Sequence, residues 1–435
     1  MDASPARFIA FCLVSLLFTF AACENPLNNG GPPPPTHLTV EDATEWLKVQ
    51  TSGTSGNPVK LVIDVDLGNM PWAVPQGNWL ALLNAIDEAG KHVYLDLSAS
   101  TMSGSIVFNP GKSTGAASNH PGMGKIVGLV LPDIAESIAN GTTTQTGSTT
   151  NAISVTFRNF NNLRSISGAG IKNTGLNTFS ELTSLVTVSF PAVTVIGERA
   201  FFECTNLATI DLQTATSIGH NAFRQTKIST ANFPAVVEVS MAAFINCFNL
   251  VTASFPQATH IRIGAFSNST SLATLYLPLA THIDEQAFQH SGISVLSLPE
   301  ATNIGHLAFH NNRNLVTVNL PKVTTIGNEA FRDCARLSEV YIPKVQTIGQ
   351  STQDQNVMGT FHNCPALTRL TLGETPPSFP ANYSHNEWRT FRGTTTASFT
   401  IRRPSASATL YDTWLAGNQA HFNNDAANIQ FRNYP

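Results

Sequence analysis

Two pairs of side chains in this sequence have a spacing that could support metal or acid–base chemistry. His260 and His282 occupy the same position of consecutive repeating units, so stacked units would place them about 5 Å apart. Asp64 and Asp66 alternate within a segment that predicts a strand, and would share one of its faces. Neither pair is accompanied by further ligands or by a second catalytic element. We therefore expect solvent-facing histidines, surface carboxylates and no metal site.

Four cysteines share one position of the same unit. Each lies three residues after a phenylalanine: Cys204, Cys247, Cys334 and Cys364. Other units hold small polar residues there: Thr226, Ser269, Ser291 and Asn312. This pattern predicts small, semi-buried side chains. Only Cys334 and Cys364 fall on neighbouring units, so a disulfide between them is compatible with an exported protein. The sequence has no C-x-x-C spacing, which argues against zinc.

The motifs that support common enzyme chemistries are absent from the sequence. It contains no nucleophile elbow, zincin helix, P-loop or dinucleotide fingerprint. Charged residues make up only 12% of the chain and the formal net charge is -4, which gives no electrostatic footprint for nucleic acid or another polyanion. We therefore predict a protein that is not an enzyme, needs no cofactor and binds no nucleic acid.

Phenylalanines recur at a regular spacing through much of the chain. An Ala-Phe pair recurs at intervals of 21 or 22 residues, Phe179 precedes the series by one interval, and the last member follows after 30 residues. The series is Phe179, Phe201, Phe223, Phe244, Phe266, Phe288, Phe309, Phe331 and Phe361. Such periodicity indicates a solenoid, in which each unit, or rung, buries its apolar side against its neighbours.

The unit from Asn314 to Leu337 (NLVTVNLPKVTTIGNEAFRDCARL) shows the pattern in full. Alternating apolar residues around Val318 predict a short strand, and Pro321 ends it because proline has no backbone N–H. Gly327 is expected to permit a tight turn, and Phe331 to fill the interior. The middle units replace this glycine by Ser240, Arg262 and Asp284.

The repeating pattern L-x-x-V-x-L-P-x-V-T-x-I-G-x-x-A-F-x-x-C extends over about Asn151 to Leu372 and resembles the BspA-like leucine-rich repeat surface (lipo)protein family. The resemblance implies a leucine-rich repeat solenoid of short parallel β-strands stacked in rungs of about 22 residues. It also implies an exported bacterial protein, since members of the family are often adhesins that bind host matrix or plasma proteins, or other bacteria.

Less regular segments flank the repeats and predict a cap at each end. Residues 38–150 would form an N-terminal α/β cap and degenerate rungs, with a helix starting at Thr39, a strand at Lys60–Leu67, a second helix at Asn78–Ala89 and a strand at His92–Ser98. Residues 151–372 would form the array. Residues 373–435 would form a C-terminal cap with a strand at Thr400–Pro404 and a short helix after Ala408.

The first residues read as a targeting segment. Phe8–Phe20 is apolar but too short for a mature membrane span, and Ala21, Ala22 and Cys23 follow it like a bacterial lipobox. We expect residues 1–22 to be a signal peptide, Cys23 to be lipidated and residues 23–37 to form a proline-rich tether. The alternative is ordinary secretory cleavage near Ala22. Lipidation would anchor the protein in the bacterial envelope, at the outer membrane or cell surface.

Recognition is expected on the concave face of the array, where two side chains of each strand should point outward. Threonine dominates the first outward column, and such a ladder can be merely structural. The residues that break the two columns are candidates for protein contact: Tyr276, Tyr341, Glu339 and Arg369. A polar insertion, residues 350–357, should loop outward before Phe361 and supplies Gln353 and Asp354 as further candidates.

These features favour a lipid-anchored surface protein whose array binds a protein on a host or neighbouring cell. The alternative is a structural envelope protein with no soluble ligand. A carbohydrate- or metal-dependent enzyme is the remote third reading, because no motif supports it.

Overall fold

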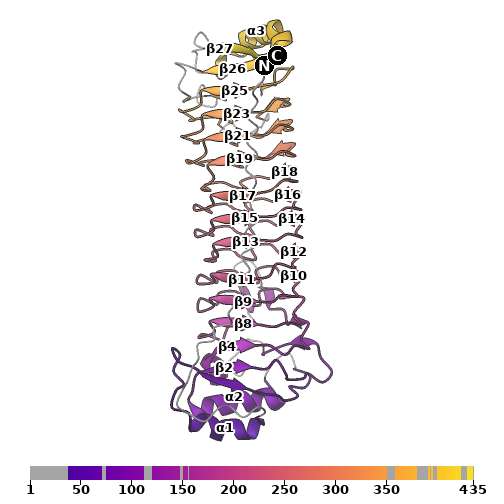
Figure 1. Cartoon of the computed structure of the whole chain (residues 1–435), viewed down its shortest axis with the longest axis vertical. Coiled ribbons are helices and arrows are strands. Elements are labelled where there is room, and N and C mark those ends of the chain that lie inside the picture. Colours follow the sequence, from indigo (N-terminus) through magenta and orange to yellow (C-terminus); the bar gives the residue numbers. More distant parts are fainter. Residues whose placement is uncertain are drawn as a thin grey trace, which may run out of the picture.

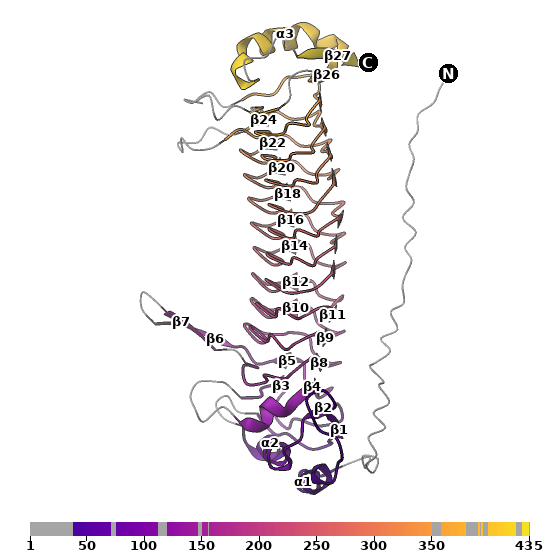
Figure 2. The same ribbon diagram turned by 90° about the vertical axis from the view of Figure 1, so that its left-hand side faces the viewer.

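The computed structural model shows an elongated column of stacked turns that runs nearly straight from end to end (Figures 1 and 2). The structure describes residues 38–70, 75–111, 120–146, 150–154, 156–349, 358–379, 390–391, 393–394, 399–422 and 429–434. The predicted signal peptide, Cys23 and the tether lie outside the described residues, and so do Gln353 and Asp354. The array is a leucine-rich repeat solenoid, as the sequence predicts.

Two helices close the N-terminal end of the column (Figure 1). Helix α1, Val40–Lys48, begins after Thr39, whose hydroxyl accepts the backbone N–H of Asp42. Helix α2, Gly77–Ala89, ends at Gly90, which adopts the left-handed conformation with φ 67°. Both helices were expected, and they cover an end of the core that would otherwise face water.

The main strand column contributes one short parallel strand from each rung. Its first sheet contains β1 (Val59–Val62), β2 (Val93–Asp96), β4 (Ile126–Val130), β8 (Ser165–Ser167), β9 (Thr187–Ser189) and β11 (Thr209–Asp211). A three-stranded sheet follows, with β13 (Thr230–Asn232), β15 (Thr252–Ser254) and β17 (Thr274–Tyr276). The last sheet contains β19 (Val295–Ser297), β21 (Thr317–Asn319), β23 (Glu339–Tyr341), β25 (Arg369–Thr371), β26 (Thr400–Pro404) and β27 (Gln430–Tyr434).

A second column of two-residue strands runs along another side of the stack. Its early members are β3 (Val107–Phe108), β5 (Ser137–Ile138), β10 (Val195–Ile196) and β12 (Ser217–Ile218). Its continuous sheet contains β14 (Glu238–Val239), β16 (His260–Ile261), β18 (His282–Ile283), β20 (Asn303–Ile304), β22 (Thr325–Ile326) and β24 (Thr347–Ile348). In the strands from β10 onward the second residue is buried.

The main column is interrupted between β11 and β13 and between β17 and β19. Each interruption follows a rung with one residue fewer at the corner after its phenylalanine. Ile228 lies five residues after Phe223, whereas Leu250 lies six residues after Phe244. Because a shorter corner reaches the next strand position one residue early, the strand loses its ladder with the rung before it.

The aromatic rings form one continuous ladder inside the column. Neighbouring ring centroids lie 4.8 to 6.4 Å apart, and the Phe244 and Phe266 rings are nearly parallel at 5.3 Å. The ladder extends beyond the predicted series at both ends. It runs through Trp79, Phe108, Phe157, Phe179, Phe201, Phe223, Phe244, Phe266, Phe288, Phe309, Phe331, Phe361, Phe391 and Phe422.

Two left-handed residues, not the glycine, make the corner around each ring from Phe179 to Phe331. Glu329 and Asp333 flank Phe331 and have φ values of 54° and 60°. The prediction that Gly327 provides the tight turn is therefore wrong. Gly327 is needed because a Cβ atom there would lie 2.7 Å from the backbone carbon of Gly305 in the preceding rung.

Two of the three rungs that lack this glycine keep the same backbone hydrogen bond. The N–H of Gly327 donates to the carbonyl of Ile304 at 2.7 Å. The N–H groups of Arg262 and Asp284 likewise donate to carbonyls of the preceding rung at 2.9 Å. Rung spacing is thus held by the backbone at this position even where the side chain differs.

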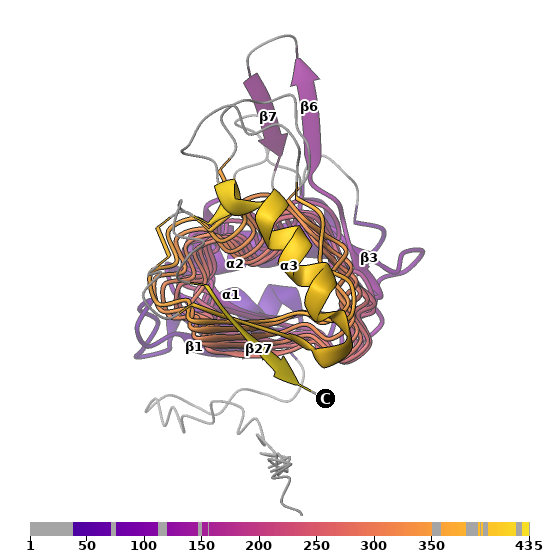
Figure 3. The ribbon, with the colours of Figure 1, turned by 90° about the horizontal axis from the view of Figure 1, so that it is seen from above.

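An antiparallel hairpin projects from the side of the column and was not anticipated from the sequence. Strands β6, Thr142–Thr146, and β7, Thr150–Ser154, pair with each other alone and extend away from the stack (Figures 2 and 3). The threonine-rich sequence of β6 suits an extended strand but carries no rung pattern, so periodicity could not reveal it.

The C-terminal end has its own lid. Helix α3, Ala408–Gly417, lies across the end of the stack (Figure 3), and its Tyr411 is completely buried. The expected strand at Thr400–Pro404 and the helix after Ala408 are both present. Among the described residues, no helix is long and apolar enough to cross a bilayer.

Loss of one ring from the ladder should destabilise the array strongly. Phe266 is fully buried, so Phe266→Ala should reduce the free energy of unfolding by about 3–5 kcal/mol, because it leaves a cavity between two stacked rings. Urea denaturation followed by circular dichroism measures the change. Phe248, which is 54% exposed, provides the matched control, and Phe248→Ala should alter stability by less than about 0.5 kcal/mol. Equal effects of the two substitutions would contradict the role of the ladder.

Candidate ligand-binding face and C-terminal groove

The two columns of outward strand residues lie in the predicted strands, but the face that they form is straight. The expected concave surface is absent from the described array, because the rungs stack without marked curvature (Figure 2). The first outward column contains Thr187, Thr209, Thr230, Thr252, Thr274, Val295, Thr317, Glu339 and Arg369. The second contains Ser189, Asp211, Asn232, Ser254, Tyr276, Ser297, Asn319, Tyr341 and Thr371, and of these Thr371 is buried.

The two candidate tyrosines are both solvent-exposed but do not form one cluster. Tyr276 is 55% exposed and Tyr341 is 43% exposed. Tyr276 ends β17 at an interruption of the main column, whereas Tyr341 ends β23. Three strand spacings separate them, a distance of about 14 Å. A ligand would have to extend along the column to contact both.

Glu339 and Arg369 form an ion pair across neighbouring strands. They are register partners on β23 and β25, and Arg369 Nη1 lies 2.5 Å from Glu339 Oε1. Both side chains are about half exposed, so the pair contributes on the order of 0.2–1 kcal/mol to stability. The two charges largely neutralise each other in the free protein.

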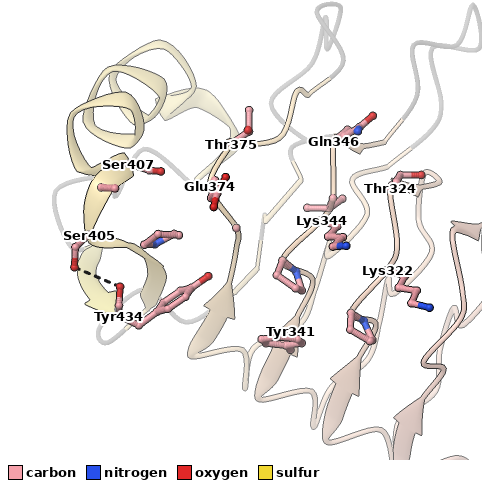
Figure 4. A pocket seen from close by; sticks show the side chains of 16 residues that line it. Lys322, Thr324, Tyr341, Lys344, Gln346, Glu374, Thr375, Ser405, Ser407 and Tyr434 are labelled. Atoms are coloured by element: carbon pink, nitrogen blue, oxygen red, sulfur yellow. Dashed lines mark hydrogen bonds between the residues drawn. The ribbon is translucent and has the colours of Figure 1, made fainter.

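A groove opens beside Tyr341, at the carboxyl ends of the last strands (Figure 4). Its volume is about 1300 Å³. Three prolines and two tyrosines form much of its lining: Pro321, Pro343, Pro404, Tyr341 and Tyr434. We call this feature the C-terminal groove. Its walls come from residues more than a hundred positions apart in the chain, from Pro321 to Tyr434, and no sequence pattern links them.

Hydrogen bonds to the last rungs fix the C-terminal wall of this groove. Tyr434 Oη donates to the carbonyl of Leu372 at 2.6 Å, and Tyr411 Oη donates to the carbonyl of Gly373 at 3.0 Å. Gly373 stands where earlier rungs have proline, and a Cβ there would lie 1.7 Å from the Pro343 carbonyl oxygen. Burial, with Tyr341 close by, raises the pKa of Tyr434 above its usual value.

The two paired histidines stack as predicted. The rings of His260 and His282 are 4.7 Å apart and nearly parallel. Each Nδ1 lies 2.9 Å from the hydroxyl of the preceding threonine, Thr259 or Thr281. No group of three or more potential metal ligands is found in the described part of the chain.

Asp64 and Asp66 do not share the face of a strand, because β1 ends at Val62. That prediction is wrong. The Asp66 carboxylate instead accepts backbone N–H groups from Gly68 at 2.9 Å and Ser103 at 2.8 Å. These hydrogen bonds, led by those from Ser103, lower the pKa of Asp66 to about 2. The carboxylate caps a loop of the N-terminal region.

The four cysteines are buried completely, not partly as predicted, and all four thiols are free. Each thiol donates to the carbonyl of the aromatic-ladder residue in the preceding rung, as Cys334 does to Phe309 at 3.3 Å and Cys364 does to Phe331 at 3.0 Å. In other rungs Ser269 donates to the equivalent carbonyl. The shared property of this repeat position is therefore a small hydrogen-bond donor, and no disulfide joins Cys334 to Cys364.

Parallel strands stacked in rungs of 21 or 22 residues, closed by a cap at each end, place the chain among leucine-rich repeat proteins. A model of the BspA type leucine-rich repeat region, with six copies, matches residues 142–251 and 237–368, about half of the chain. The chain belongs to this BspA-type family.

Solved structures resemble the chain at low sequence identity. A leucine-rich cell surface protein from Faecalibacterium prausnitzii is 21% identical with a TM-score of 0.35, and the match covers 68% of this chain and 87% of that one. A leucine-rich repeat protein from Bacteroides ovatus is 15% identical with a TM-score of 0.26, over 71% of this chain and 92% of that one. No curated protein sequence matches significantly.

The buried thiols should resist alkylation while the protein is folded. Burial raises the pKa of Cys247 to about 11 and that of Cys364 to about 12, so neither forms a thiolate near neutral pH. Iodoacetamide at mildly alkaline pH should leave Cys204, Cys247, Cys334 and Cys364 unmodified, and should modify all four after unfolding in guanidinium. Peptide mass mapping measures both states. A native Cys334–Cys364 bridge would instead protect those two residues even in the unfolded, non-reduced protein.

Proposed function

We propose that this protein is an exported, lipid-anchored protein of the bacterial cell surface whose repeat array binds a protein ligand. Its membership of the BspA-type family supports a role as a repeat scaffold. The apolar segment before Cys23 and the proline-rich stretch after it support export, lipidation and a spacer from the membrane. We assign residues 1–22 to the signal peptide, 23–37 to the tether, 38–150 and 373–435 to the caps, and 151–372 to the array.

The proposed ligand is a protein of the host matrix or plasma, or of another bacterium, and the proposed contact surface is the late part of the main strand column. The observation that carries this proposal is the position of Tyr341, which is exposed on the strand face and also lines the C-terminal groove. An exposed aromatic side chain beside a groove is a frequent centre of protein binding. The Glu339–Arg369 pair adjoins it, and Tyr276 would extend the contact along the column.

Gln353 and Asp354 are proposed as a second contact, from the polar insertion that precedes Phe361. A structural envelope protein without a soluble ligand remains the alternative, because much of the strand face is a threonine ladder that would also serve a purely structural array. Protease treatment of intact cells separates these functions, since an array that faces the periplasm would be protected.

Removal of the exposed late-rung side chains should abolish ligand binding without unfolding the protein. A variant with Tyr276, Tyr341 and Arg369 all replaced by alanine should capture at least about tenfold less protein from serum or extracellular-matrix extract. A control variant carries alanine at Phe248, Ile263 and Arg313, which are exposed on other parts of the column. Thermal unfolding monitors the fold of both. Equal capture by the variant and the wild type would rule out this contact surface.

Lipid attachment should depend on Cys23 alone. Replacing Cys23 by serine should abolish incorporation of labelled palmitate and should shift the protein from the membrane fraction to the soluble fraction. Substitution of Cys12, which lies within the proposed signal peptide, serves as the control and should leave both readouts unchanged. Labelled protein that persists after Cys23→Ser would place the anchor elsewhere.

A further inference from the structure

Cations on the sides of the column are repeatedly matched by carboxylates one rung away. Nitrogen–oxygen distances in four such pairs are 2.5 to 2.7 Å. The pairs are Lys172–Glu136, Arg262–Glu238, Lys322–Glu300 and Arg369–Glu339. Ion pairs between neighbouring rungs neutralise charge along the stack.

The last two strands carry two cations that are not matched in this way. Arg402 of β26 and Arg432 of β27 are register partners, continue the second outward column beyond Thr371, and are both exposed. Within the described part of the chain, no carboxylate forms an ion pair with either residue. Like charges directly opposite each other on neighbouring strands repel, so the free protein gains nothing from this arrangement. A bound anion between them would relieve the repulsion.

Arg402 lies beside the C-terminal groove, and Arg432 is its register partner on the next strand. The guanidinium carbon of Arg402 lies 5.8 Å from the centre of the Tyr434 ring, and Tyr434 lines the groove together with Tyr341. Lys344 also lines the groove (Figure 4) and has no described carboxylate as an ion-pair partner. Lys322, in contrast, forms an ion pair with Glu300.

The balance of unpaired charge in this region is therefore positive. Arg402, Arg432 and Lys344 supply three cations, and Glu374 is the acidic residue of the groove lining. The local surface thus differs from the whole chain, whose formal net charge is -4. It favours an anionic ligand and repels a basic one.

The shape of the groove limits the ligand to a narrow, extended one. Its walls come from the ends of four successive strands, β21, β23, β25 and β26, at Pro321, Pro343, Gly373 and Pro404. Three spacings of about 4.8 Å give a length near 14 Å, which about four extended residues would fill. Proline residues have no backbone N–H donor, so the walls can only pack against a ligand. The charged groups of the ligand must therefore bind to residues at the rim.

We propose that the C-terminal groove binds an acidic, extended segment of a protein partner, with its carboxylates on Arg402, Arg432 and Lys344. This inference rests on the proposed function, because it names the part of a protein ligand that the late rungs contact. The rings of Tyr341 and Tyr434 pack against the segment, and Glu374 disfavours segments with a carboxylate near that end of the groove.

Fluorescence anisotropy with the full-length folded protein tests this inference. The probe is a fluorescein-labelled eight-residue peptide of alternating glutamate and serine, and the matched peptide has glutamine for glutamate. The glutamate peptide should bind at low ionic strength and weaken with salt, and the glutamine peptide should bind at least about tenfold more weakly. R402Q/R432Q should raise the Kd of the glutamate peptide by about tenfold or more, and K344Q by a smaller factor.

R336Q is the matched control, since Arg336 is exposed at a corner outside the groove, and it should leave the Kd unchanged. R402Q/R432Q should also keep or raise the Tm, because it removes a repulsion. Failure of the glutamate peptide to bind the wild type would overturn the inference, as would equal loss with R336Q. Preferential binding of heparin through Arg402 and Arg432, without peptide binding, would overturn it in favour of a polysaccharide.

Capture of protein from serum or matrix extract distinguishes this inference from the proposed function. If the peptide does not bind but the Tyr276, Tyr341 and Arg369 variant still loses capture, the groove inference falls and the proposed function stands. If the peptide binds as expected while that variant captures as much protein as the wild type, the groove inference is supported and the contact surface assigned under the proposed function is contradicted.

Discussion

Mutual burial of neighbouring rungs is the constraint on which the rest of this structure depends. A single rung of about 22 residues has one apolar side and no second layer to cover it, so each rung is buried only by the rungs on either side. The aromatic ladder from Trp79 to Phe422 makes this dependence continuous. It also explains why both ends need lids, which helices α1 and α2 supply at one end and α3 at the other.

The parts of the fold that repeat could be predicted from the sequence, because each repeated position serves one physical purpose. The regular spacing of the phenylalanines predicted which side of each rung faces the core, and the prolines predicted where the strands end. The left-handed corners escaped prediction, since residues as different as Arg199, Ala242 and Leu307 adopt them. Position, not residue type, imposes that conformation. The burial of the cysteines was misjudged for a related reason, because this position requires a small hydrogen-bond donor, which in the cysteine rungs reaches a carbonyl of the preceding rung.

The candidate site was predictable only in part, because periodicity describes what the rungs share and recognition depends on where they differ. Tyr341, Glu339 and Arg369 stood out as exceptions within columns already recognised. The C-terminal groove could not be found in that way. It joins Pro321 to Tyr434 across an insertion and a cap, and only the folded chain brings these residues to one place.

The interruptions of the main strand column bear on how the molecule would respond to mechanical load. If the chain is anchored near its N-terminus and a ligand is held beside β25 and β26, a pull on the ligand acts along the long axis. The planes between β11 and β13 and between β17 and β19 lack a main-column ladder to carry tension. At the second plane the strands β18 and β20 remain paired, whereas at the first β12 and β14 are unpaired too. Rupture under force would therefore begin at the first plane, and would leave the ligand-bearing segment as one block.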